Sequence, residues 1–417
     1  MKSRLLITVV RRLFLPALLV LLQAAVDHPA GIAVGQEAAA KLPAWVTMPD
    51  DEFSRTYYNE ATGNQEQRSL FAWRLFARLN QQVPEPAPGG KAVFSAWELW
   101  ASDPDTFPPK GPPVGPPSSR KGPRITITAK MAITGQEVTR NALAYDYIVK
   151  KKGLYQAATV EQVVGTPTSN GSPSVDMPVG SIETKAQWVT AQQLNLPKLP
   201  ADMYIIQGND NQDYGLQALH IMAKIKTYPD GPRPIDAASW FWTTFEYYGN
   251  PNRKYLIDFI TYQDTLKYAD QKTLLTQAGL GKSQFSEEVD VPVFNSQTGV
   301  TTTVKGNNYL CNGTQYTFVG TDPKTKNEIN VILGNSILEG QFTVPSPPGT
   351  KNPFRGWNAS CHTCHYEASG NKLSLPGAFH SVTGNISLGY SDGERLVPID
   401  FEWSIPFNAQ RPPKNGK

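Results

Sequence analysis

The chain has 417 residues, more than an average domain but within the size of a single large one. Hydrophobic residues make up 40% and aromatic residues 10%, a composition that suits folding around a core and argues against a disordered protein. The formal net charge is only +3 and no run of five like charges occurs, so nothing in the sequence suggests binding to nucleic acid.

The N-terminal segment has the order of regions of a secretory signal peptide. A basic start, MKSRLLITVVRRLF, leads into the apolar stretch Leu13–Val26, which is short for a membrane span and contains Pro16. Small residues at Ala33–Gly35 then offer a cleavage site. We therefore expect a signal peptide over residues 1–35 and a periplasmic or otherwise exported mature protein without a membrane span. An uncleaved anchor is the alternative.

After this segment the pattern predicts a helix over residues 65–80, because Leu70, Trp73 and Ala77 recur on one helical face. The stretch over residues 103–123 is dense in Pro, Gly and Ser. Such a composition predicts a surface loop without a regular element.

The elements that follow are mostly strands. The segments 203–208 and 239–251 are rich in aromatic and β-branched residues, which favour strands, and a helix with a glycine stop is predicted over 268–281. Further strands are predicted at 124–128, 300–306, 315–320 and 330–334, a turn-rich insertion at 165–178, and two more core segments at 181–189 and 216–226.

This mixture, together with 35 prolines and 33 glycines, predicts an α+β fold with an irregular, loop-rich plan and a single large core. We expect residues 36–417 to form one domain. The segment 352–417 is too short for a domain of its own and should dock on the preceding core.

The C-terminal part contains the clearest chemical motif. Cys361-His362-Thr363-Cys364-His365 is the C-x-x-C-H signature of covalent c-type haem attachment. Two thiols three positions apart can each form a thioether with one haem vinyl group, and the histidine that follows reaches the iron. The motif predicts one haem c per chain, bound through Cys361, Cys364 and His365, with His365 as the proximal iron ligand.

Three other uses of these cysteines stay open. Cys361 and Cys364 can form a simple disulfide, since export leads to an oxidising compartment. A redox-active pair would be expected near a βαβ pattern and would not need the following histidine. Zinc would need two more ligands, and the mature chain offers only Cys311, His220 and His380.

The second axial ligand of the iron is not given by the motif. No methionine follows Cys364, so the ligand is His380 downstream, comes from upstream, or is absent. The upstream candidates are His220, Met222 and Met203, of which we prefer His220 because it is a polar residue in an apolar segment. Each histidine can instead be an ordinary hydrogen-bonded residue.

Several segments resemble a family of large exported bacterial proteins labelled as c-type cytochromes. The resemblance implies one integrated unit with a covalently bound haem and brings no established reaction with it. This chain departs from the family pattern after Glu246, where Tyr247 replaces a common histidine. The matching segments are the helix around Trp73, Ile182-Glu183-x-Lys185-Ala186-x-Trp188, Leu219-His220-Ile221, Trp240-x-Trp242-x-Thr244-Phe245-Glu246, Gly313-Thr314-Gln315, Gly334-Asn335-Ser336-x-Leu338-Glu339, Cys361-x-x-Cys364-His365 and Asp400-Phe401-x-Trp403-Ser404.

Three charged residues share the apolar setting of His220. Glu183, Lys185 and Glu246 stand among apolar and aromatic neighbours, which is typical of buried functional groups. Alternatively, Glu183 and Lys185 lie on one side of a strand and form an ordinary ion pair.

These observations lead to a main functional hypothesis and two alternatives. The first is periplasmic electron transfer by a monohaem cytochrome that meets a redox partner protein or a small-molecule donor or acceptor. The second is a haem-dependent oxidoreductase, peroxidase-like or oxygenase-like, with an open distal position. The third is a haem-based sensor or binding module. The chain is larger than a simple electron carrier requires, whereas the absence of a second C-x-x-C-H argues against a dihaem peroxidase.

Overall fold

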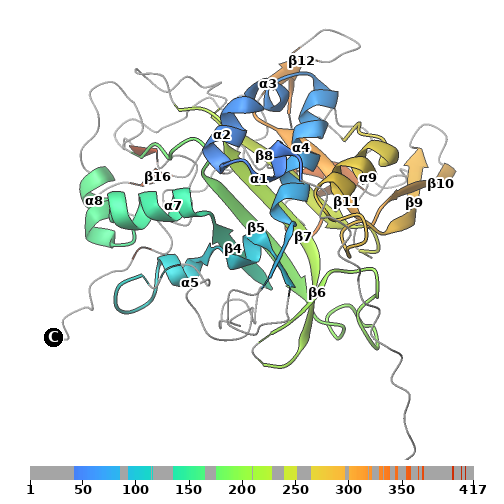
Figure 1. The fold of residues 1–417 in the computed structure, drawn as a ribbon, viewed down its shortest axis with the longest axis horizontal. Helices are drawn as coiled ribbons and strands as arrows, with labels where there is room; N and C mark the ends of the chain where they lie inside the picture. The colour runs from blue at the N-terminus through green and yellow to red at the C-terminus, as the bar shows by residue number, and fades with distance from the viewer. Residues whose placement is uncertain are drawn as a thin grey trace, which may run out of the picture. The chain divides into compact units, whose positions relative to one another are not determined.

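A seven-stranded antiparallel sheet lies at the centre of the fold in this computed structural model (Figure 1). The strand order is β11-β8-β7-β5-β4-β3, and β6 also pairs with β7. The strands are β3 (Ala101–Ser102), β4 (Gln136–Arg140), β5 (Ile182–Val189), β6 (Ile205–Gln207), β7 (Asp213–Lys224), β8 (Trp240–Tyr247) and β11 (Tyr309–Gln315).

The described part of the chain belongs to one compact unit, Leu42–Lys417. The structure describes residues 42–84, 93–113, 115, 135–164, 175–208, 210–227, 239–250, 264–295, 300–317, 319–321, 328–331, 333–338, 343–345, 354–357, 365, 369–370, 397–398, 405 and 409. The predicted signal peptide over residues 1–35 lies outside them, as does the predicted strand at 124–128. Among the described helices, none combines the length and the apolar character needed to cross a membrane.

The two long central strands are buried on both faces. All eight residues of β8 are buried, as is β7 from Gly215 to Lys224. Side chains of a strand alternate between the two faces of its sheet, so each face needs its own covering layer. The two layers are two separate hydrophobic clusters.

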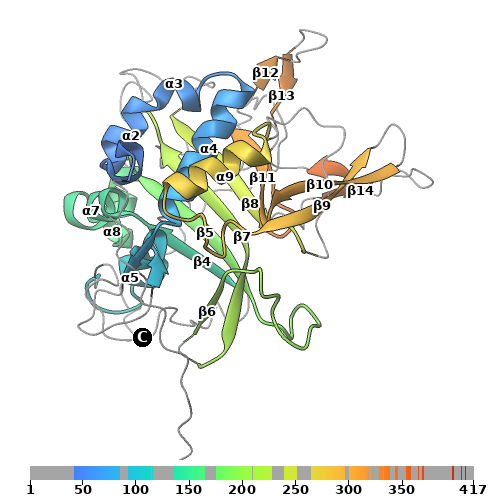
Figure 2. The same cartoon turned by 45° about the vertical axis from the view of Figure 1, so that its right-hand side comes forward.

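Helices cover the first face. Helix α4 (Gln65–Leu79) begins with a capping box, in which the Asn64 side chain accepts from the Gln67 amide and the Gln67 side chain accepts from the Asn64 amide. Its Phe76 ring stacks on Phe245 of β8 at a centroid distance of 4.1 Å. Figures 1 and 2 show α4 and α9 (Tyr268–Gln277) crossing the sheet next to the short helices α1 (Ala44–Thr47), α2 (Asp50–Thr56) and α3 (Tyr58–Ala61).

A smaller cluster covers the second face. Met222 of β7 and Trp240 and Trp242 of β8 pack there with residues from the helical segments that follow β4. These segments are α7 (Ala142–Asp146), the π-helix η3 (Tyr147–Lys151) and α8 (Ala157–Val164).

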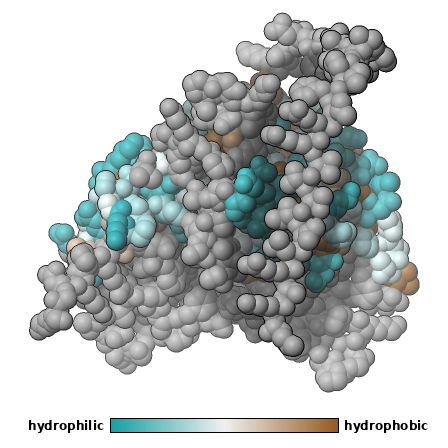
Figure 3. All heavy atoms as spheres, turned by 90° about the horizontal axis from the view of Figure 1, so that it is seen from below, coloured by the Kyte–Doolittle hydropathy of each residue, from teal (hydrophilic) through white to brown (hydrophobic). Residues whose placement is uncertain are grey.

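The described protein atoms that face the viewer in Figure 3 are mainly hydrophilic, with apolar atoms at separate places.

The remaining strands form two-stranded antiparallel pairs. With its helices and antiparallel strands the fold is α+β, as predicted. The pairs are β1 (Gln82–Pro84) with β2 (Val93–Ser95), β9 (Glu288–Asn295) with β10 (Val300–Asn307), β12 (Val319–Thr321) with β13 (Glu328–Asn330), β14 (Thr343–Pro345) with β15 (Phe354–Trp357), and β16 (Ser369–Gly370) with β17 (Val397–Pro398).

The helix predicted over 65–80 and the strands predicted at 203–208, 239–251 and 300–306 are present, with shifted ends. The helix predicted over 268–281 is also present, and it stops before Gly279, whose φ of +79° favours glycine.

Three predictions about elements were wrong in part. The stretch 103–123 is not all loop, because α5 (Asp103–Thr106) begins there; Asp105 accepts from the Ser102 amide and hydroxyl, which caps the helix despite the prolines. The predicted strand 315–320 is split between the end of β11 at Gln315 and β12 (Val319–Thr321), and the predicted strand 330–334 overlaps only the end of β13 at Asn330.

A carboxylate joins the two helices on the first face. Asp264 accepts hydrogen bonds from the indole Nε1 of Trp73 on α4 at 2.9 Å, the Gln271 side chain on α9 at 3.2 Å and the Leu266 amide at 2.9 Å. Burial nevertheless raises the pKa of Asp264 to about 6, because the hydrogen bonds that lower it do not offset the lost hydration.

This raised pKa predicts a pH dependence of stability. A carboxyl group with a higher pKa in the folded than in the unfolded chain stabilises the fold when protonated, and this contribution is lost as the pH rises through about 6. Between pH 5 and 7.5 the wild-type free energy of unfolding should therefore fall by about 1 kcal/mol relative to that of Asp264→Asn. Urea titrations followed by far-UV circular dichroism measure the difference, and parallel pH profiles for both proteins would contradict the assignment.

Candidate functional site

His365, the last residue of the cysteine motif, lies against the second face of the sheet. Its imidazole ring packs on the indole of Trp242, with ring centroids 4.4 Å apart and planes inclined by 54°. His365 is half-buried. Cys361, Cys364 and His380 lie outside the described residues, so their predicted roles stay predictions.

Trp242 is placed by the alternation of β8. Its neighbours Phe241 and Thr243 point to the first face, where Phe241 belongs to the core under α4, and Trp242 therefore points to the second. The side chain is only 3% exposed. In the part of the chain that the structure describes, its buried Nε1 has no hydrogen-bond partner. This N–H is a donor that a neighbouring acceptor can use.

Two residues with iron-binding side chains share this face. Met222 of β7 lies directly opposite Trp242, and His220, two positions earlier on the same strand, lies opposite Thr244. Both are buried, at 3% and 7% exposure. Residues two apart on a strand point the same way, so Met222 and His220 are side by side on the face that His365 contacts.

Met203 and Cys311 belong to the other face. Both are members of the cluster that packs under α4. The sheet therefore separates Met203 from His365, which removes it as a candidate iron ligand. It also separates Cys311 from His220, so the two cannot complete a zinc site with the cysteine motif.

The Cys311 thiol is a buried core group. It lies 3.4 Å from the Thr243 hydroxyl. Burial and, to a lesser extent, the negative charge of Asp264 raise the pKa of the Cys311 thiol well above its usual range. A thiol that stays protonated is a poor nucleophile and a poor metal ligand, so Cys311 has a packing role.

Glu246 lies at the end of the same face and is fully buried. Ser336 donates to its carboxylate through both its backbone amide and its hydroxyl, and Asn312 Nδ2 donates at 2.9 Å. Asn335 Nδ2 donates to Thr244 Oγ1 at 2.8 Å. The carboxylate thus fixes the Asn335–Ser336 turn to β8, which is a structural task.

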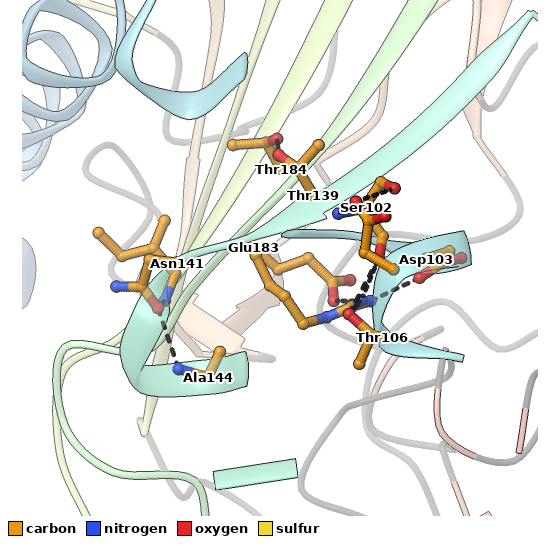
Figure 4. Close-up of polar contacts among 11 residues, drawn as sticks. Ser102, Asp103, Thr106, Thr139, Asn141, Ala144, Glu183 and Thr184 are labelled. Carbon is orange, nitrogen blue, oxygen red and sulfur yellow. Dashed lines mark hydrogen bonds and ion pairs between the residues drawn. The ribbon is translucent and has the colours of Figure 1, made fainter. Parts of the chain in front are cut away.

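Glu183 takes part in the most extensive buried ionic cluster that is described. Arg140 of β4 is fully buried and donates to Glu183 at 3.1 Å, to Asp103 at 2.5 Å and to the Thr106 hydroxyl at 2.7 Å. Figure 4 shows Asp103 and Thr106 of α5 and Glu183 of β5 converging on this point. The Arg140 guanidinium also lies 5.2 Å from the centroid of the Phe107 ring. Glu183 therefore forms its ion pair with Arg140 and not with Lys185 as the alternative reading of the sequence had it. The spacing of residues in the sequence did not predict this partner.

Sequence reasoning also missed Lys224 on the second face. Its ammonium is completely buried, forms a 2.8 Å ion pair with Asp176 and lies 5.4 Å from the Trp240 ring. A lysine inside the apolar run LQALHIMAKIK is the signal that points to such a partner. Lys185 is half-buried and lies opposite His220 in the β5–β7 ladder.

Taken together, the second face has an apolar and aromatic centre, Met222 and Trp242, with His220 beside it and buried ion pairs around it. No family model, no curated protein and no solved structure matches this chain.

The Arg140 cluster gives a stability prediction. Arg140→Met removes the cation and leaves two carboxylates facing each other, so it should lower the free energy of unfolding by about 3–5 kcal/mol. The matched control is Arg55→Met, which breaks the surface pair with Asp51 and should cost at most about 1 kcal/mol. Urea denaturation of the two variants and the wild type measures both values. Equal losses of unfolding free energy would show that the buried cluster contributes no more to stability than the surface pair.

Proposed function

We propose that the chain binds one haem c through thioethers from Cys361 and Cys364, with His365 as the proximal iron ligand, and that it transfers electrons as an exported, periplasmic protein. The complete C-x-x-C-H motif behind a signal-peptide-like segment is the basis of the proposal. The observation that carries it further is the contact between His365 and the buried Trp242.

The residues around His365 suit a haem. The group is large and apolar, and Met222 and Trp242 provide an apolar wall on the second face. A six-coordinate iron needs a second nitrogen or sulfur ligand, and His220 and Met222 offer one of each on that face. The buried Nε1 of Trp242 offers a hydrogen-bond donor to a carboxylate such as a haem propionate.

A bound haem supplies one-electron Fe(III)/Fe(II) chemistry. Trp242 limits the rotation of the His365 imidazole by packing on it and keeps water from that side. The Arg140 cation, paired with Asp103 and Glu183, and the Lys224 cation, paired with Asp176, hold the surrounding elements in place. Such a rigid surrounding suits electron transfer, in which little should move.

Electron transfer is favoured over catalysis by the state of Glu246. A peroxidase-like or oxygenase-like centre needs an open distal position with a free acid or base. The Glu246 carboxylate is engaged by Ser336 and Asn312, and Glu183 by Arg140. The physiological partner is then a redox protein or a small-molecule donor or acceptor. Optical spectra of the iron, described below, distinguish electron transfer from the oxidoreductase and sensor alternatives.

Covalent haem can be tested on a denaturing gel. The wild-type protein, exported in cells with cytochrome c maturation, should stain for haem peroxidase activity after denaturation, because thioethers survive unfolding. A Cys361→Ser, Cys364→Ser double variant is the control and should not stain. The proposal would be refuted if the wild-type protein does not stain while another c-type cytochrome, matured in the same cells, does.

The second ligand can be tested by optical spectroscopy. We propose His220, so His220→Ala should convert a low-spin six-coordinate spectrum into a high-spin one that binds carbon monoxide, whereas Met222→Leu should leave the low-spin spectrum in place. The opposite result would identify Met222 as the second iron ligand. A low-spin spectrum in both variants would leave His380 as the second ligand. A wild-type iron that already binds carbon monoxide would favour the oxidoreductase or sensor function.

A further inference from the structure

A cavity of about 140 Å³ lies beside one end of the central sheet, and the proposed haem chemistry makes no use of it. Its walls come from the segment that precedes β6, from β7 and from the end of β8. Lining residues include Leu194, Leu196, Met203, Gln217, Tyr247 and Asn250.

Gln217 reaches the cavity because of a β-bulge. In the β5–β7 ladder, Gln187 pairs with Ala218 and Trp188 pairs with Leu216, so Gln217 is the extra residue on β7. A bulge interrupts the alternation of side chains and turns one of them in a new direction. Gln217 is 5% exposed and lines the cavity, although it belongs to a strand with two apolar faces.

The Gln217 amide is held in one orientation. Its Nε2 donates to Asn250 Oδ1 at 3.2 Å, and Asn250 is 6% exposed. Within the described part of the chain this is the hydrogen bond that the Gln217 side chain makes, and its Oε1 is left as an acceptor at the cavity wall. An amide oxygen at a cavity wall can accept a hydrogen bond from an O–H or N–H donor.

The remaining wall is mainly apolar. Leu194 and Met203 contribute aliphatic and thioether surface, and Tyr247 contributes its ring. The Tyr247 hydroxyl does not compete for a ligand, because it donates to Asp202 at 2.7 Å. The cavity volume is close to that of an engineered apolar cavity of about 150 Å³ that accepts benzene. The size therefore corresponds to a single six-membered ring.

From the cavity and the bulge we infer that this protein binds a small phenol-class molecule here, with its ring between Leu194, Met203 and Tyr247 and its hydroxyl donating to Gln217 Oε1. Leu196, which is 42% exposed, stands at the rim. The site is on the Met203 side of the fold and does not depend on bound haem.

Calorimetric titration of the full-length exported protein with phenol and with toluene tests the inference, since the two ligands have equal numbers of heavy atoms and differ in the hydroxyl. The wild type should bind phenol saturably at one site. In Gln217→Leu, phenol should bind about tenfold or more weakly while toluene keeps its affinity within about threefold, because only phenol loses a hydrogen bond.

Leu196→Trp is the second variant and fills the rim from an exposed position, so it should weaken both ligands without unfolding the protein. Far-UV circular dichroism and thermal melting check that each variant is folded. Phenol that does not saturate the wild type, or phenol affinity unchanged in both folded variants, would overturn the site. Equal losses of phenol and toluene in Gln217→Leu would overturn the hydrogen bond.

Discussion

The burial of β7 and β8 on both faces is the constraint on which the rest of the structure depends. Neighbouring side chains of a strand point to opposite faces, so Leu219 and Ile221 enter the aromatic core under α4 while His220 and Met222 enter the smaller cluster opposite. A slip of one residue in the ladder would exchange the two sets. The same register brings Trp242 to the face that His365 contacts, and this is why the proposed haem site has an apolar wall and two candidate ligands.

The second face shows how a sheet can bury charge. Arg140, Lys224 and Glu246 are completely enclosed, and each has partners from a distant part of the chain. An unpaired charge in such a place would be strongly destabilising, so these pairs also fix which loops lie over the sheet. The Arg140 partners hold α5, Asp176 holds the segment before β5, and Ser336 holds the turn that closes the end of β8. The polar groups thus position the layer around His365, and the apolar groups fill it.

The sequence predicted the elements that carry their own pattern. The α4 helix follows from the spacing of Leu70, Trp73 and Ala77, and β8 follows from its aromatic and β-branched residues. The haem motif that ends at His365 is also a local pattern, and the haem that it predicts stays a prediction. What could not be predicted depends on register: the pairing of Arg140 with Glu183 joins residues 43 positions apart, and the bulge at Gln217 appears only when β5 is laid against β7. The helix in the proline-rich stretch was missed because capping by Ser102 and Asp105 outweighed composition.

The proposal that the Trp242 face of the sheet is the haem site can be tested directly. Anomalous X-ray scattering at the iron absorption edge, measured on crystals of the exported and matured protein, locates the metal directly. We expect a single iron peak bonded to the imidazole of His365, on the side of the sheet that carries Trp242 and Met222. The absence of an iron peak, or an iron bound away from His365 and from this face, would contradict it.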